Sequence, residues 1–362
     1  MTIHSRTSQF IVHQEQPFNA EPQGTLLRGS FLTPQEHFFV RTHGSIPTVD
    51  PASYRLRITG MVQRDLEISL DELRSLAPAH TITATLQCAG NRRDELIAVQ
   101  PLPGQVPWRS GAISTAIWRG IPLRAVLKAV GVQAGAQHVA FTSLDETQFE
   151  GEQVSFGASI ALEKALSADV LLAYEMNGEP LTPEHGFPLR VVVPGYIGAR
   201  SVKWLHEIIL QDHVSTNPYQ ARDYKTFPPE ITAATVDWSR GKMLEELALS
   251  AVIITPKEGE ARATGPTRVQ GFAIASPETP VEQVELSVDG GATWTTADIV
   301  RRADPYAWCF WEATLDLAPG DCQIIVRAWD TAKQTQPEDV RQVWNFKGYM
   351  NTAWHSVTIH LS

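Results

Sequence analysis

One cysteine stands in the segment of the chain that is richest in reactive and charged side chains. Cys88 ends an apolar-alternating run, and residues 89–91 form a small-residue turn that is followed at once by Arg92 and Arg93. A cysteine acts as a nucleophile or metal ligand in its thiolate form, which neighbouring guanidinium groups favour. Thiolates suit soft or high-valent metals, and arginine suits oxyanions. The segment therefore indicates a metal ligand beside an anion pocket. The plainer alternative is a buried, inert cysteine beside two surface arginines.

Three further segments combine basic side chains with glycine or aromatic residues near predicted strand ends. They are residues 38–44, 184–190 and 199–204. Each alone could be a solvated loop. Together with the Cys88 segment they fit a pocket for a large phosphorylated cofactor, in which Arg and Lys neutralise phosphate and backbone amides hold it. The GxGxxG, GxxxxGK[ST], HExxH and CxxCH motifs are absent, and the 11 histidines do not cluster, so a zinc site is not indicated.

Composition narrows the class of protein. The chain has 362 residues, 43% hydrophobic and 19% charged, with a formal net charge of −10, which is typical of a soluble protein of two or three domains. No run of Lys or Arg suggests nucleic-acid binding. No apolar run is long enough to cross a membrane. We see neither a signal peptide nor a twin-arginine leader, so we expect a cytoplasmic protein, or a periplasmic one if a leader has been removed. Three cysteines without a CxxC pair exclude a disulfide framework.

Residues from about 30 to 240 are predicted to mix helices and strands. Ser69 and Glu72 fit a capping box, which opens a helix. Pro122 can occupy the first turn of another helix, and Gly131 can end it. Between these two residues lies one apolar stripe, formed by Leu123, Val126, Leu127 and Val130. These helices and their neighbouring strands must position the reactive segments.

The pattern changes after about residue 245. Apolar and polar residues alternate over 284–288, residues 289–291 are a turn signal, and a second strand is predicted through Trp294. Residues 323–329 predict another strand. Short strands separated by turns are typical of an antiparallel β-sandwich.

Longer stretches of the chain match one known enzyme family. The matching segments lie in both parts of the chain: residues 83–93, 111–115, 172–178, 185–188, 198–205, 286–294, 344–348 and 351–355. Over roughly residues 31–355 the chain resembles the sulfite oxidase family of molybdenum enzymes. The resemblance implies an α+β protein with three parts. These are an N-terminal arm over 1–30, a mixed α/β molybdopterin-binding catalytic domain over 31–240, and an immunoglobulin-like β-sandwich dimerisation domain over 245–362.

The resemblance also implies a cofactor and its ligands. In this family, a pyranopterin (molybdopterin) dithiolene and one protein cysteine hold molybdenum, which makes Cys88 the expected metal ligand. The residues expected to contact the pterin and its phosphate are Phe39, Val40, Arg41, Thr42, His43, Asp145, His185, Arg190, Ser201, Val202 and Lys203. Arg190 and Lys203 are also phosphate-pairing types on chemical grounds. Thr42 replaces the asparagine of the family pattern, so an altered pterin contact is expected.

The implied reaction is the oxidation of sulfite to sulfate by oxo transfer at molybdenum. Alongside Cys88, the catalytic residues expected around the substrate are Arg41, Arg93, Trp108, Tyr224 and Lys347. Lysine at 347, where the family usually has arginine, keeps the charge but loses the two-pronged donor, so weaker binding of sulfite or a similar small oxyanion is expected. Trp108 could instead be plain core, and Tyr224 a capping hydroxyl.

Partners and alternatives follow from the same resemblance. No haem domain is expected in this chain, so electrons would pass to an external acceptor: a cytochrome, another redox protein or oxygen. The sandwich implies a symmetric homodimer. One alternative is a related oxotransferase, such as a nitrate reductase-like enzyme or a dehydrogenase for another sulfur compound, although Tyr224 and Lys347 favour sulfite. An alternative of another class is a non-enzymatic binding protein built on the β-sandwich.

Overall fold

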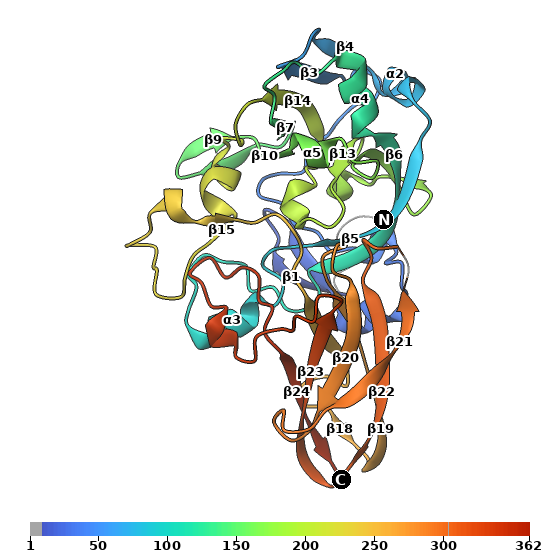
Figure 1. Cartoon of the computed structure of the whole chain (residues 1–362), viewed down its shortest axis with the longest axis vertical. Helices are drawn as coiled ribbons and strands as arrows, with labels where there is room; N and C mark the ends of the chain where they lie inside the picture. Colours follow the sequence, from blue (N-terminus) through green and yellow to red (C-terminus); the bar gives the residue numbers. More distant parts are fainter. Residues whose placement is uncertain (1–8, 303) are drawn as a thin grey trace.

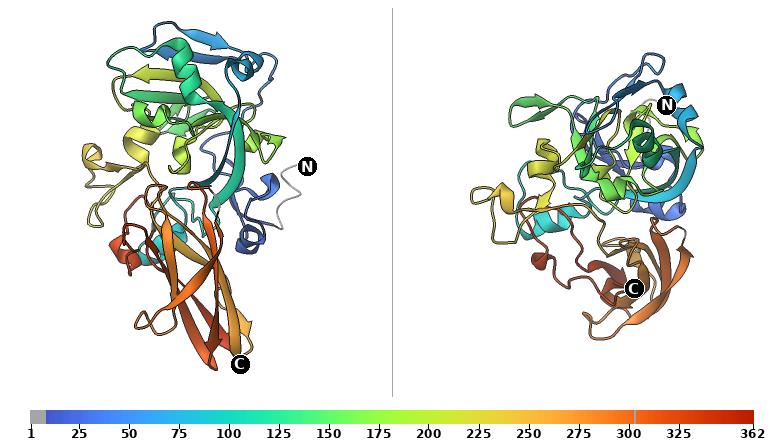
Figure 2. Two further views of the ribbon diagram at one scale, coloured as in Figure 1. Left: turned by 45° about the vertical axis from the view of Figure 1, so that its right-hand side comes forward. Right: turned by 45° about the horizontal axis from the view of Figure 1, so that its top comes forward.

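The computed structural model describes residues 9–302 and 304–362, and it shows two parts arranged along the long axis of the molecule (Figure 1). The first eight residues of the expected arm lie outside the described residues. The α/β part contains two main sheets, and the C-terminal strands gather at the opposite end, with the C-terminus at its far tip (Figures 1 and 2). This arrangement confirms the expected order, a mixed α/β domain followed by a β-sandwich domain.

The first sheet of the α/β part has the order β10-β7-β14-β3-β4. Its strands are β3 (Leu56–Gly60), β4 (Leu66–Ile68), β7 (His138–Ser143), β10 (Gly157–Ala161) and β14 (Leu205–Gln211). The second sheet has the order β12-β11-β6-β5, and β13 also pairs with β11. Its strands are β5 (His80–Gln87), β6 (Ile113–Pro122), β11 (Leu171–Met176), β12 (Glu179–Pro180) and β13 (Arg190–Val192). The ends of β5, β7 and β13 lead into segments that carry the predicted site residues.

Helices and short hairpins surround these sheets. The helices are α1 (Gly24–Gly29), α2 (Leu70–Leu76), α3 (Arg93–Val99), α4 (Leu123–Val130) and α5 (Leu162–Ala165). The hairpins are β1 (Phe10–Gln14) with β2 (Asn19–Pro22), β8 (Thr147–Phe149) with β9 (Glu152–Val154), and β15 (Lys225–Thr226) with β16 (Lys242–Met243). Single turns of other helix types are η2 (Gln35–His37), η3 (Pro183–His185), η4 (Gly198–Arg200), η5 (Tyr219–Asp223), η6 (Trp238–Arg240) and η7 (Val340–Gln342).

Local sequence signals explain the helix boundaries. The hydroxyl of Ser69 accepts from the backbone N of Glu72 at 3.3 Å, and the Glu72 carboxyl accepts from the backbone N of Ser69 at 2.8 Å, which confirms the capping box of α2. Helix α4 begins directly after Pro122 and ends at Gly131, whose φ of 72° suits glycine. The predicted apolar stripe of α4 is fully buried in the core.

The C-terminal strands follow the order β17-β19-β22-β21-β20-β23-β24-β18. They are β17 (Ser250–Thr255), β18 (Ala261–Arg262), β19 (Gly265–Ile274), β20 (Val281–Ser287), β21 (Thr295–Arg302), β22 (Cys309–Leu317), β23 (Gly320–Asp330) and β24 (His355–Leu361). The strand β17 also packs on β23 and β24, so the strands enclose a core that includes Val269, Val284, Trp311, Ile324 and Ile359.

Two predicted strand ends in this domain were wrong. Strand β20 stops at Ser287, leaving Val288 exposed, and β21 starts only after Trp294. The cause is a long turn. The Asp289 carboxyl accepts from the backbone N of Thr293 at 2.9 Å, so the residues between them cannot join the strand pairing.

The C-terminal domain contacts both sides of the Cys88 segment. On β5, the backbone N of Thr85 donates to the carbonyl O of Tyr306 at 2.9 Å, and the Thr85 hydroxyl accepts from the backbone N of Trp308 at 2.9 Å. Beyond Cys88, the backbone N of Met350 donates to the carbonyl O of Ala89 at 2.8 Å. The second domain therefore helps to position the strand and the turn that carry the cysteine. Within the described residues, no helix has the length and apolar character needed to cross a bilayer.

Candidate active site

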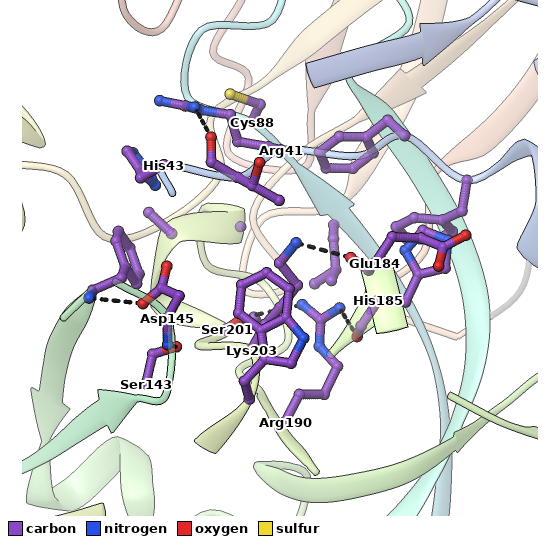
Figure 3. Close-up of a pocket in the computed structure, with 18 of the residues that line it drawn as sticks. Arg41, His43, Cys88, Ser143, Asp145, Glu184, His185, Arg190, Ser201 and Lys203 are labelled. Atoms are coloured by element: carbon purple, nitrogen blue, oxygen red, sulfur yellow. Dashed lines mark hydrogen bonds between the residues drawn. The ribbon is translucent and has the colours of Figure 1, made fainter. Parts of the chain in front are cut away.

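A cavity lies where the predicted segments converge. Its lining brings together eleven of the expected residues: Phe39, Arg41, Thr42, His43, Cys88, Asp145, His185, Arg190, Ser201, Lys203 and Tyr224. The lining is completed by Phe38, Leu86, Ala89, Ser143, Phe156, Glu184, Gly198, Ala199 and Trp204. Figure 3 shows Cys88 and Arg41 toward one end of this cavity and Arg190 and Lys203 toward the other. The site therefore has a thiol end and a basic end.

At the thiol end, the backbone around Cys88 is firmly held. The backbone N of Cys88 donates to the carbonyl O of Ala112 at 2.9 Å, and Sγ accepts from the backbone N of Gly90 at 3.4 Å. The Asn91 side chain ties the same turn to the backbone N of Ala112 at 3.0 Å. Cys88 is 6% exposed and lines the cavity. The thiol is thus fixed in place while one side remains open to a ligand or metal.

At the basic end, the buried Arg190 and the partly buried Lys203 donate to backbone carbonyl groups. The Arg190 guanidinium donates to the carbonyl O of His185 at 2.9 Å and of Ser201 at 3.0 Å, and Lys203 Nζ donates to the carbonyl O of Glu184 at 2.8 Å. Burial lowers the pKa of Arg190 to about 9. Burial, together with the neighbouring Arg190 charge, lowers the pKa of Lys203 well below its usual range. An anion bound here would offset the cost of burying both charges.

A histidine and an aspartate beside this basic end are shifted by burial toward their neutral forms. Burial lowers the pKa of His185 to about 3, so its ring carries no charge near neutral pH. Burial also raises the pKa of Asp145, although its carboxyl accepts from the backbone N of Phe156 at 2.9 Å. The arrangement favours a ligand that brings negative charge to Arg190 and Lys203.

Near the thiol, Tyr224 and His43 form a hydrogen bond at 3.1 Å between the hydroxyl and Nε2. Burial, followed by the positive charge of Arg41, lowers the pKa of His43 well below its usual range, which favours the neutral ring. Burial raises the pKa of Tyr224, which therefore keeps its proton. Burial alone would lower the pKa of Arg41, but Tyr224 and Cys88 favour the charged form, and its pKa is raised. A permanent cation and a hydroxyl donor thus face the cavity beside Cys88.

Two of the expected pterin contacts do not line this cavity. Val40 is bridged to Ala20, and its side chain is buried. Val202 turns into the core, while Ser201 and Lys203 on either side of it face the cavity. Successive residues of an extended segment point to opposite sides, so a continuous run could not contact one ligand through every side chain.

Three expected substrate residues also lie outside the cavity lining. Trp108 is fully buried, and its ring lies edge-on to the ring of His13 with 5.0 Å between centroids. This placement agrees with the alternative that Trp108 is a core residue. Arg93 donates to the carbonyl O of Gly348 at 2.8 Å and of Val106 at 2.9 Å. Lys347 Nζ is bound to the Asp223 carboxyl instead of facing the cavity. A neighbouring carboxylate thus pairs with its charge, and the expected contact of Lys347 with the substrate stays a prediction.

Sequence reasoning missed three residues that shape this region: Asn19, Asp223 and Tyr349. The Tyr349 ring stacks on that of Tyr224 with 5.3 Å between centroids, and its hydroxyl donates to Asp223 at 3.1 Å. Asp223 and Tyr349 lie within two positions of Tyr224 and Lys347, so proximity in sequence was an available signal. Asn19 lies far from every motif, and no such signal marked it.

Comparison with known proteins identifies the class of protein that this fold and site define. Residues 43–219 match the family model of the oxidoreductase molybdopterin binding domain, and residues 241–362 match that of the Mo-co oxidoreductase dimerisation domain. The protein is therefore a molybdopterin-binding oxidoreductase and not a mere binding module. The match to a molybdopterin-binding domain confirms the expected molybdenum–pterin cofactor.

Individual relatives narrow the class further. The chain is 44% identical over 354 residues to sulfite oxidase of Gallus gallus, covering 95% of this chain and 76% of that protein. It is 39% identical over 371 residues to sulfite oxidase of Arabidopsis thaliana, covering 97% of this chain and 93% of that protein. The solved structure of the sulfane dehydrogenase SoxCD from Paracoccus pantotrophus aligns with a TM-score of 0.82 at 25% identity, covering 100% of this chain and 92% of that one. The chain belongs to the sulfite oxidase family.

The residues of the cavity fit the cofactor that the family implies. Molybdopterin carries a phosphate, and within the described residues the basic side chains of Arg190 and Lys203 have only neutral carbonyl groups as hydrogen-bond acceptors. A thiol at the other end of the same cavity is a suitable metal ligand. Cys88 would thus hold the metal, and Arg190 and Lys203 would hold the phosphate.

Proposed function

We propose that this protein oxidises sulfite to sulfate with molybdenum and passes the electrons to an external acceptor. The relatives named sulfite oxidase support this substrate. The observation that carries the proposal is the placement of Cys88, the charged Arg41 and the protonated Tyr224 on one cavity that also holds a buried phosphate-binding pair. When bound, the molybdenum group supplies the centre that takes up electrons and transfers oxygen.

The residues of this chain have separate tasks in that reaction. Arg41 attracts the anionic substrate and holds it near Cys88, because its guanidinium charge lies in a site with little water to screen it. The Tyr224 hydroxyl can turn from His43 Nε2 to a substrate oxygen, because it keeps its proton.

Metal analysis combined with an activity assay tests this function. We expect purified holoenzyme to contain molybdenum stoichiometrically and to reduce ferricyanide or a cytochrome only when sulfite is added. A molybdenum-loaded protein that leaves sulfite untouched but reduces nitrate with a reduced dye would replace this proposal with the nitrate alternative. Oxidation of another sulfur compound in place of sulfite would identify the protein as a different sulfur dehydrogenase.

We also propose that the protein forms a homodimer through residues 241–362, which the match to a dimerisation domain supports. A closed two-fold dimer uses the same surface of both copies, so the interface should be self-complementary. Sedimentation equilibrium at micromolar concentration should give twice the mass of the chain. A mass of one chain under these conditions would contradict the proposal.

A further inference from the structure

The hairpin of β1 and β2 places one asparagine directly behind the thiol end of the cavity. Asn19 is fully buried. Its Oδ1 accepts from Arg41 Nη1 at 3.2 Å and from the backbone N of Thr42 at 2.9 Å. Its Nδ2 donates to Gln14 Oε1 at 2.8 Å and to the carbonyl O of Pro17 at 3.1 Å. The Asn19 side-chain amide therefore accepts two hydrogen bonds and donates two, which is its full capacity.

The consequence for Arg41 is that only one of its terminal nitrogens is anchored to protein. Nη1 donates to Asn19 and to the carbonyl O of Thr42. Within the described residues, Nε and Nη2 donate no hydrogen bond, and Arg41 lines the cavity beside Cys88. A guanidinium binds an oxyanion best through two parallel N–H groups, and Nε with Nη2 is such an edge. The anchored nitrogen fixes the direction in which this edge can point.

We propose that Asn19 is a positioning residue, which orients Arg41 so that its Nε–Nη2 edge presents two donors to the anionic substrate. This inference rests on the proposed function for the identity of the anion. Asn19 lies outside residues 43–219, which match the molybdopterin-binding domain, so a segment beyond that domain takes part in substrate binding.

The amide chemistry explains why asparagine is suited to this position. Alanine would leave the buried backbone N of Thr42 without its acceptor and would free Arg41 Nη1 to swing. Aspartate would keep the acceptor oxygen, but it would lose the donors to Gln14 and Pro17 and add a negative charge against Arg41. Both changes should weaken anion binding through Arg41.

The first test separates binding from turnover in the holoenzyme. Asn19→Ala should raise KM for sulfite roughly ten-fold with little change in kcat, since one charge-assisted hydrogen bond is lost and the metal centre is untouched. Sulfate affinity, measured by titration calorimetry without turnover, should fall by a similar factor. Gln14→Ala is the matched control, because it removes a bond of the same amide on the side away from Arg41. It should leave KM and sulfate affinity near the wild-type values.

The second test asks whether Asn19 acts through Arg41. In an Arg41→Ala background, Asn19→Ala should have no further effect on KM or on sulfate affinity. If the ratio of KM values is the same in both backgrounds, Asn19 has a general structural role and the inference is wrong.

Asn19→Asp, which keeps the same shape, covers the case in which the alanine variant does not fold. A wild-type KM in the Asn19→Asp variant would equally overturn the inference. If the wild-type protein does not oxidise sulfite, the proposed function fails, while sulfate binding still tests Asn19.

Discussion

The surroundings of two buried cysteines give them different chemistry in this chain. Cys309 lies in the core of the C-terminal domain, where burial raises the pKa of its thiol to about 11. Cys88 lines a cavity that also holds Arg41, and its Sγ accepts from a backbone N–H. A thiol in an apolar core stays protonated and inert, whereas one beside a cation and a backbone donor can serve as a ligand.

Cys88→Ser should abolish sulfite oxidation and leave the fold largely intact. A hydroxyl oxygen is similar in size, but it is a poor replacement for a soft sulfur donor. Steady-state turnover, the molybdenum content and the far-UV circular dichroism spectrum would check this. Cys309→Ala, in the core of the other domain, is the control and should stay active. Substantial turnover by a molybdenum-loaded Cys88→Ser protein would show that the thiol is not the ligand.

Lys347 should matter through its ion pair. Lys347→Ala leaves the half-buried Asp223 carboxylate, which lies beside Tyr349, without its cation. The unpaired negative charge should repel the anionic substrate, so we expect KM for sulfite to rise by about three-fold or more. Lys347→Arg can still pair with Asp223 and should change KM by less than about two-fold. Kinetics at fixed pH and ionic strength would measure both. If Lys347→Arg lowers KM several-fold, residue 347 reaches the anion directly, as the sequence alone had indicated.

At the scale of elements, the N-terminal hairpin organises two separate loops of the site. Asn19 binds the Arg41 segment, and Glu21 binds the loop that follows Trp108. The Glu21 carboxyl is fully buried and accepts from the backbone N of Arg109 at 2.7 Å and of Gly111 at 2.6 Å. The same carboxyl contacts His13 Nε2 at 2.6 Å. One short hairpin therefore contacts both Arg41 and the loop that leads to Ala112, whose carbonyl O accepts from the backbone N of Cys88.

Glu21→Gln should destabilise the protein, because an amide nitrogen would face backbone donors and leave one of them unsatisfied. The expected loss is roughly 1–3 kcal/mol. That loss should lower the melting temperature by several degrees, which scanning calorimetry would detect. Glu15→Gln, at an exposed position of the same hairpin, should leave it unchanged. Equal melting temperatures for both variants would show that the carboxyl does not hold the loop.

Local patterns predicted several elements and most of the cavity. The capping box of α2 and the apolar stripe of α4 depend on neighbours in sequence, and both were confirmed. Arg190 and Lys203 were chosen by residue type, and both line the cavity. Asn19 and the partner of Lys347 could not be found in this way. Their contacts join segments 22 and 124 residues apart, and no periodicity encodes such pairings.

At the scale of the whole molecule, the two domains meet at the turn that follows Cys88. The buried Arg92 guanidinium donates to the carbonyl O of Ala353 at 2.8 Å and of Trp354 at 3.1 Å, and it also pairs with Glu95. Directly after these residues, His355 Nδ1 accepts from the backbone N of Ile253 at 3.2 Å. This bond requires Nδ1 to be unprotonated.

His355 should make the stability of the protein fall on acidification. Burial, reinforced by the Arg92 charge, lowers its pKa to about 4, below the value of about 6.5 in an unfolded chain. The unfolded state therefore binds more protons between these values, so stability is lost as the pH falls from about 6.5 to about 4. His355→Asn keeps an acceptor for Ile253 and removes the titration. Urea unfolding midpoints across this range should then depend less on pH, and an unchanged slope would contradict the assignment.

The contacts of Arg92 and Arg93 bear on how the chain can be divided. Both guanidinium groups come from the α/β part, yet carbonyl groups of residues 348, 353 and 354 accept from them. A fragment cut at residue 240 would keep Cys88, Arg190, Lys203 and every residue that lines the cavity, but it would lose these acceptors. Arg92 and Arg93, which are both buried in the whole chain, would then be exposed to water beside Cys88. The α/β part therefore depends on the C-terminal domain for these contacts. A shortened protein that keeps the cavity intact must also retain the segment from Gly348 to Trp354.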